Sequence, residues 1–131
     1  MRITYMLCFA VLVLFSCKDD AEVVLEPSED IVGSWSLSSA TGGLNPVVFT
    51  YEKGEVTLEF SESTVTIINQ TEEEIGFPEG VYAYELTEND FGGLSLVVDD
   101  GFFNGGFELF TTQFTIDQRA WDGPLYTFVR D

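Results

Sequence analysis

The chain has 131 residues and a formal net charge of −18, with 23 acidic side chains against five basic ones and no histidine. This balance excludes a nucleic-acid-binding protein, because contact with phosphates requires clusters of Lys and Arg. The length predicts one domain, and a hydrophobic content of 45% with 15% aromatic residues supplies a core, which excludes a disordered acidic tail.

The first segment has the layout of a secretory signal. Arg2 is the only charge in the first sixteen residues, and an apolar stretch runs from Ile3 to Phe15. At about 1.5 Å of rise per residue a helix of this stretch spans roughly 20 Å, which is shorter than the ~30 Å hydrocarbon core of a bilayer. A cleaved signal is therefore favoured over a permanent transmembrane anchor.

The signal ends in Leu-Phe-Ser-Cys at residues 14–17. This border resembles the lipobox of bacterial lipoproteins: Leu14 and Ser16 match its pattern, whereas Phe15 departs from it because a smaller residue is usual there. The resemblance implies that a signal peptide of residues 1–16 is removed and that Cys17 then carries the lipid, including fatty acids such as palmitate. An ordinary secretory signal with an incidental cysteine is the alternative.

Residues 17–30 are predicted to form an acidic tether. Lys18 to Asp30 contain six acids and one proline, and they reach at most roughly 45 Å when fully extended. The acids directly after Cys17 resemble the signals that send some Gram-negative lipoproteins to the outer face of the outer membrane. We therefore expect a lipid-anchored protein of the bacterial cell envelope, most simply of the outer membrane, whose contact with the membrane is the lipid.

From Ser34 onward apolar residues recur with period two, which is typical of half-buried β-strands. Trp35 and Leu37 share one face of the first predicted strand, and residues 55–60 alternate strictly. Further strands are expected at residues 47–51, 64–69, 80–87, 94–98, 107–116 (as one strand or two) and 125–130. Residues 75–80 are expected to form a turn-rich link, and residues 99–106 a loop.

The absence of a long helical period predicts an all-β antiparallel fold, either an up-and-down barrel of about eight strands or a β-sandwich. Gly33-Ser34-Trp35 fits the G-x-W signature that opens the first strand of lipocalins, and with the closing segment YTFVRD it makes residues 31–131 resemble the small lipocalin-like domains of bacterial lipoproteins. The resemblance implies an eight-stranded barrel closed at one end by Trp35 and Arg130, with the guanidinium across the indole face. A flanking helix, common in that family, is not evident here.

Two functions remain open. In the first, a small hydrophobic ligand sits inside the barrel, against side chains from one face of several strands: Leu37, Val56, Leu58, Phe60, Tyr82, Tyr84 and Phe128. In the second, aromatic side chains fill the barrel, as they do in the narrowest ones. The domain then serves as a structural or interaction module that contacts a protein or polymer through exposed residues such as Phe102, Phe103 and Trp121.

The composition argues against catalysis and metal binding. Without histidine, Ser-His-Asp triads, Cys-His pairs and histidine-ligated metal sites cannot form. One loop offers oxygens to a calcium ion, from Asp99, Asp100, Asn104 and Glu108. It lacks the spacing of an EF-hand, so an Asp-Gly turn with an aromatic tip is favoured. We expect no enzyme activity, no cofactor and no metal, and the sequence does not set the oligomeric state.

Overall fold

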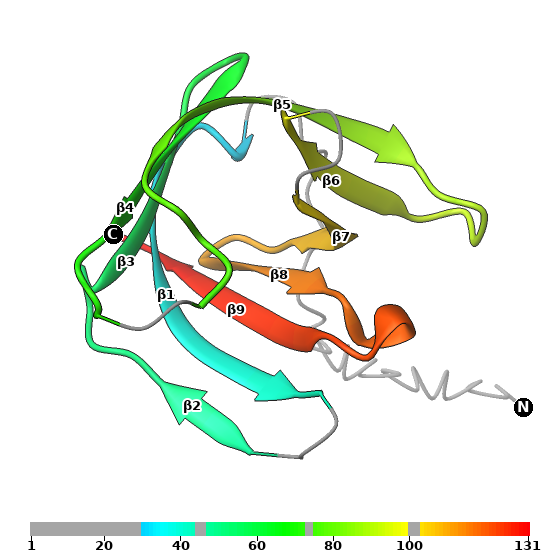
Figure 1. The fold of residues 1–131 in the computed structure, drawn as a ribbon. Helices are drawn as coiled ribbons and strands as arrows, with labels where there is room; N and C mark the ends of the chain where they lie inside the picture. Colours follow the sequence, from blue (N-terminus) through cyan, green and yellow to red (C-terminus); the bar gives the residue numbers. More distant parts are fainter. Residues whose placement is uncertain (1–29, 44–46, 73–74, 100–102) are drawn as a thin grey trace, which may run out of the picture.

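The computed structural model describes residues 30–43, 47–72, 75–99 and 103–131, and these form nine strands of one antiparallel sheet (Figure 1). The strands are β1 (Gly33–Gly42), β2 (Val48–Thr50), β3 (Val56–Phe60), β4 (Thr64–Asn69), β5 (Gly80–Glu88), β6 (Leu94–Val98), β7 (Phe103–Leu109), β8 (Gln113–Asp117) and β9 (Pro124–Arg130). The 3-10 turn η2 (Arg119–Trp121) precedes β9.

The sheet closes into a barrel because β1 pairs with β9 as well as with β3. Strands β1 and β3 to β9 follow one another around it as an eight-stranded, up-and-down, lipocalin-like barrel, which confirms the predicted barrel over the sandwich. The added strand β2 pairs with the second half of β1, from Ser39 to Thr41, and lies at the edge of the sheet (Figure 1).

Alternation along each strand sends apolar side chains into the barrel and polar ones to the outer face. In β3, Val56, Leu58 and Phe60 are buried, whereas Glu59 is exposed. In β1 a bulge between Leu37 and Ser39 shifts the phase by one residue, so that Trp35 and Ala40 both face the core. The interior side chains thus follow the period-two pattern, apart from the one-residue shift at the bulge in β1.

The structure decides one alternative that the sequence left open and moves the limits of two other strands. Residues 107–116 belong to two strands, β7 and β8, which are joined by a turn closed by the Phe110 N–H donating to the Gln113 carbonyl at 2.8 Å. Strand β7 begins at Phe103, within the predicted loop, because residues 103–107 pair with β6. Strand β2 is limited to Val48–Thr50, and its residues are exposed.

Phe77, in the link between β4 and β5, is part of the barrel core. Its side chain is 2% exposed, and its ring lies edge-on to Tyr126 at 4.8 Å and to Phe128 at 5.6 Å. The period-two pattern stops before this residue, so the sequence predicts only a turn-rich link. The structure shows that the link supplies an interior side chain.

Candidate functional site

Side chains fill the interior of the barrel. The ring of Phe114 stacks on that of Phe128, with centroids 4.8 Å apart, and lies edge-on to Trp35 at 5.0 Å. One hollow inside the barrel measures about 10 Å³ and is bounded by Leu58, Phe60, Val65, Ile67, Phe77, Leu96, Val98 and Ile116. Ligand pockets usually measure about 300–1,000 Å³. This hollow between core side chains is therefore far smaller than a usual ligand pocket.

The seven side chains predicted to line a ligand belong to this packed core. Five of them are buried: Leu37, Val56, Leu58, Phe60 and Phe128. Tyr82 and Tyr84 are partly buried and pack against the others. Tyr84 lies edge-on to Phe60 at 5.0 Å, and its hydroxyl donates to the Ser61 carbonyl oxygen at 2.8 Å. The structure brings the seven together as packing residues.

Trp35 and Arg130 meet at one end of the barrel. They are paired in register between β1 and β9, and the guanidinium carbon of Arg130 lies 4.2 Å from the centre of the indole ring. Trp35 is fully buried, and its Nε1 donates to the Ile31 carbonyl oxygen at 2.7 Å. The exposed Arg130 donates from Nη2 to the Asp30 carbonyl oxygen. This end is thus covered by a cation held on an aromatic face.

The glycine of the G-x-W segment has a physical reason in this arrangement. Gly33 has a φ of 133°, which side chains other than glycine rarely adopt. A Cβ atom added to Gly33 would lie 3.5 Å from Nη1 of Arg130. The backbone therefore passes close to the arginine that covers Trp35.

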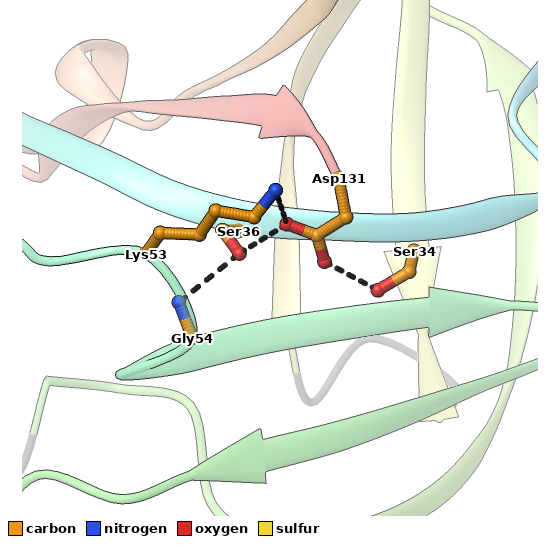
Figure 2. Close-up of polar contacts among 5 residues, drawn as sticks. All are labelled: Ser34, Ser36, Lys53, Gly54 and Asp131. Atoms are coloured by element: carbon orange, nitrogen blue, oxygen red, sulfur yellow. Dashed lines mark hydrogen bonds and ion pairs between the residues drawn. The ribbon is translucent and has the colours of Figure 1, made fainter.

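A polar cluster ties Asp131 to the outer face of β1 (Figure 2). Ser34 Oγ donates to Asp131 Oδ2 at 2.5 Å, Ser36 Oγ donates to Oδ1 at 2.6 Å, and Lys53 Nζ lies 3.5 Å from Oδ1. Ser36 Oγ also accepts the Gly54 N–H at 3.2 Å. Ser36 is only 1% exposed, so a substrate cannot reach its oxygen. The cluster joins Asp131, at the end of β9, to β1 and to the turn that holds Lys53 and Gly54.

Opposing effects set the pKa of Asp131. Burial acts to raise this pKa, but hydrogen bonds from Ser34 and Ser36, together with the nearby ammonium of Lys53, outweigh it and hold the pKa below its ordinary value. A depressed pKa means that the charged carboxylate is favoured in the folded state. The polar cluster is therefore formed by Asp131 in its ionised state.

Asp131→Asn is expected to lower the free energy of unfolding by about 1 kcal/mol at pH 7, because neutral hydrogen bonds replace charge-assisted ones. Since the folded pKa lies below the unfolded one, the contribution is present above about pH 4 and is lost as the pH falls through the folded pKa. Urea denaturation at a series of pH values measures it. The difference between wild type and variant should shrink in acid. Glu85→Gln, an exposed change on β5, is the control. An identical pH profile for both variants would contradict the stabilising role of the polar cluster around Asp131.

The opposite end of the barrel has an apolar hollow of about 460 Å³, here called the mouth hollow. Its lining includes Phe49, Tyr51, Ile75, Pro124 and Tyr126. The hydroxyl of Tyr126 donates to the Ile75 carbonyl oxygen at 3.3 Å. Burial, and to a lesser extent the neighbouring Tyr51, raises the pKa of Tyr126, so its hydroxyl stays protonated at neutral pH. None of the seven predicted lining residues borders this hollow.

A groove of about 690 Å³ lies across the outer face of β5 to β8, and we call it the outer groove. Phe91, in the turn between β5 and β6, is 95% exposed, and Trp121, in η2, is 64% exposed. Both line the groove, together with Thr87, Glu88, Asn89, Asp90, Ser95, Asn104, Gly106, Asp117, Arg119 and Ala120. Trp121 is exposed as its position in a turn predicts, whereas no pattern in the sequence marks Phe91 as an exposed contact.

Several predictions fall on residues outside the described ranges. These are Cys17 with its signal and most of the tether, Asp100 of the calcium hypothesis, and Phe102. In the part of the chain that the structure covers, no three Cys, Asp or Glu side chains gather as a metal site. The same part contains no helix of the length and hydropathy needed to cross a membrane.

Comparison of the chain with protein-family models, with curated proteins and with solved structures gives no match. The lipocalin-like resemblance therefore rests on the G-x-W segment and the closing strand. The geometry of the folded domain is the remaining evidence for its function.

Proposed function

We propose that this chain is a non-enzymatic interaction module whose filled barrel presents the outer groove to a partner. One contrast carries the proposal. The hollow between the core side chains measures about 10 Å³, whereas two large aromatic side chains are exposed at a groove of about 690 Å³. Exposed aromatic residues gathered at a concave surface mark binding sites on soluble domains. Binding to the outer face of a rigid barrel agrees with both observations.

The proposal includes a lipid anchor on Cys17 and a place in the bacterial envelope, most simply at the outer membrane. After loss of residues 1–16, four basic side chains face 23 acidic ones, a formal net charge of −19. Anionic lipid surfaces repel a domain of this charge. A covalent lipid supplies the membrane attachment that electrostatics oppose, and the acidic tether spaces the barrel from the bilayer.

Site-specific photocrosslinking tests the use of the outer groove. A photoreactive phenylalanine derivative in place of Ala120, in the groove wall, is expected to form covalent adducts when the full-length protein is irradiated in cells of its own bacterium. The same derivative in place of Val81, which is exposed on β5 outside the groove, is the matched control. Equal labelling at both positions, or none at Ala120, would contradict the proposal.

A second candidate function is the binding of a small hydrophobic ligand at the barrel mouth. The mouth hollow favours it, since about 460 Å³ with a lining of Phe49, Tyr51 and Tyr126 falls in the range of small-molecule sites. The ligand would lie against the core at the open end of the barrel, because Ala40 and Tyr126 line the hollow and belong to the core. Phe49 lines the mouth hollow and is not among the residues of the outer groove, so a Phe49→Ala variant distinguishes the two candidates.

A further inference from the structure

We infer that the outer groove binds a neutral glycan chain; this rests on the proposed function, because it assigns a ligand class to the same groove. The floor, the two walls and the charge of the groove each bear on the inference.

The floor is a continuous row across four strands. Thr87 pairs with Ser95, Ser95 with Gly106, and Gly106 with Asp117. With neighbouring strands about 4.8 Å apart, the row spans roughly 14 Å. Its next neighbours along the strands, such as Leu96, Phe107 and Ile116, are buried in the barrel. Since successive side chains point to opposite faces, the row lies on the outer face.

The row has the chemistry of a surface for hydroxyl groups. Thr87 is partly buried and carries a hydroxyl that both donates and accepts, Asp117 carries acceptor oxygens, and Ser95 is 9% exposed, so it adds little to the accessible surface of the floor. Gly106 has no side chain, so a ligand can approach the backbone in the middle of the row. An extended ligand with many hydroxyls matches a floor with several small polar groups and no deep apolar pocket.

Hydrogen bonds hold Phe91 in its exposed position. Asn89 Oδ1 accepts the N–H groups of Phe91 and Gly93 at 3.1 and 3.0 Å, and Asn89 Nδ2 donates to the Leu94 carbonyl oxygen at 3.1 Å. The side chain of Asn89 therefore fixes the turn, and Phe91 is part of this turn. Such preorganisation lowers the entropy lost on binding.

Trp121 stands on a similarly fixed turn at the other wall. The backbone N–H groups of Trp121 and Gly123 donate to the Gln118 carbonyl oxygen at 2.9 and 3.0 Å. Gln118 Nε2 in turn donates to the Asn104 carbonyl oxygen of β7 at 2.9 Å. The face of an aromatic ring is electronegative and attracts the weakly positive C–H groups on the apolar face of a sugar ring. Two such rings at one groove are suited to successive sugars of a chain.

Asp117 and Arg119 provide oriented polar groups between the walls. Arg119 Nε donates to Asp117 Oδ1 at 3.0 Å and Nη2 to Oδ2 at 2.6 Å, a two-point pair. The hydrogen bonds from Arg119 hold the pKa of Asp117 below its ordinary value. The pair fixes both planar groups, while the guanidinium keeps further N–H donors for a ligand oxygen.

The charge of the groove selects among ligands. Glu88, Asp90 and Asp117 line it beside one cation, Arg119, on a chain of net charge −18. Anionic polymers are therefore repelled. A basic peptide is less suited than a glycan, because the central carboxylate is already neutralised by Arg119. A neutral glycan satisfies both the aromatic walls and the polar groups that Thr87 and Asp117 add to the floor.

Affinity electrophoresis tests the inference. The full-length protein in mild detergent is run in native gels that contain dextran, starch, a mixed-linkage β-glucan, a mannan or a galactan. At least one neutral polysaccharide is expected to retard the wild type. Phe91→Ala and Trp121→Ala should each weaken the retardation about tenfold or more, as expected for removal of an aromatic anchor. Val81→Ala, an exposed change outside the groove, is the control and should behave as the wild type.

Retardation by none of the neutral polysaccharides, or retardation that both groove variants retain, would overturn the glycan inference. Loss of retardation in Phe49→Ala alone would move the sugar to the mouth hollow and would also overturn it. The photocrosslink at Ala120 separates this failure from failure of the proposed function: adducts without glycan binding leave the outer groove as a site for a protein.

Discussion

Trp35→Ala is expected to lower the free energy of unfolding by about 3–5 kcal/mol, the range found for large aromatic residues removed from packed cores. Trp35 is fully buried, lies edge-on to Phe114 at 5.0 Å and donates to the Ile31 carbonyl oxygen at 2.7 Å. The change removes the ring, leaves that carbonyl without its donor and takes away the surface on which Arg130 lies. Urea denaturation followed by circular dichroism measures the loss.

The chain contains its own matched control for this prediction. Trp121 is 64% exposed, so Trp121→Ala should change the free energy of unfolding by no more than about 0.5 kcal/mol. Trp35→Phe keeps a ring in the core but not the N–H donor, and we expect an intermediate loss of about 1–3 kcal/mol. A loss below about 1 kcal/mol for Trp35→Ala would show that this end of the barrel is not packed as described.

The strands could be predicted because one face of each is buried. In β3 the apolar residues fall at every second position, in β9 Tyr126 and Phe128 share one face, and the structure buries Val56, Leu58, Phe60, Tyr126 and Phe128. The closure of the barrel could not be predicted in this way, because the same set of strands could also form a sandwich. The pairing of β1 with β9, from Trp35 with Arg130 to Gly42 with Pro124, decides it.

Interior residues outside strands gave no such signal. Phe77 lies in a link without periodicity, so only its contacts with Tyr126 and Phe128 show that it fills the barrel. The bulge after Leu37 is also silent in the sequence, although it decides which later residues of β1 face the core. As a result, the predicted lining residues were correctly grouped on one face, but the space between them could not be predicted.

The outer groove could not be predicted for a geometric reason. Its floor joins Thr87, Ser95, Gly106 and Asp117, which are distant in the sequence and become neighbours only through the registers of three strand pairs. A shift of one residue in any of these pairs would send a member of the row to the other face. Trp121 was found because a tryptophan in an Asp-Gly-Pro turn is conspicuous, whereas Phe91 gave no comparable pattern.

The filled barrel and the outer groove are physically linked. A close-packed interior resists deformation, so it holds the outer row of polar groups at fixed spacing. A ligand on the outer face would touch neither the mouth hollow nor the end covered by Trp35 and Arg130. It would therefore leave the packing of the core unchanged. On this view the aromatic residues of the core make the barrel rigid, whereas Phe91 and Trp121 are available for contact at the outer groove.

Cys17→Ser is expected to move the protein almost completely from the membrane fraction to the soluble fraction. Each acyl CH₂ group buried in the bilayer contributes about 0.8 kcal/mol, so the acyl chains of the proposed lipid dominate the attachment. Nothing else in the chain replaces them electrostatically, because a domain with four basic and 23 acidic side chains is repelled by anionic headgroups. Fractionation of cells in carbonate buffer, followed by immunoblotting, measures the distribution.

The other cysteine supplies the control for this experiment. Cys8 lies within the proposed signal and is removed with it, so Cys8→Ser should leave the protein in the membrane fraction. Release by Cys17→Ser but not by Cys8→Ser, together with a mature protein that begins at Cys17 by mass spectrometry, is the result expected of a lipid anchor. Membrane attachment that survives Cys17→Ser would require an uncleaved apolar segment at Ile3 to Phe15 as the anchor, and the acidic tether would then join the barrel to a helix in place of a lipid.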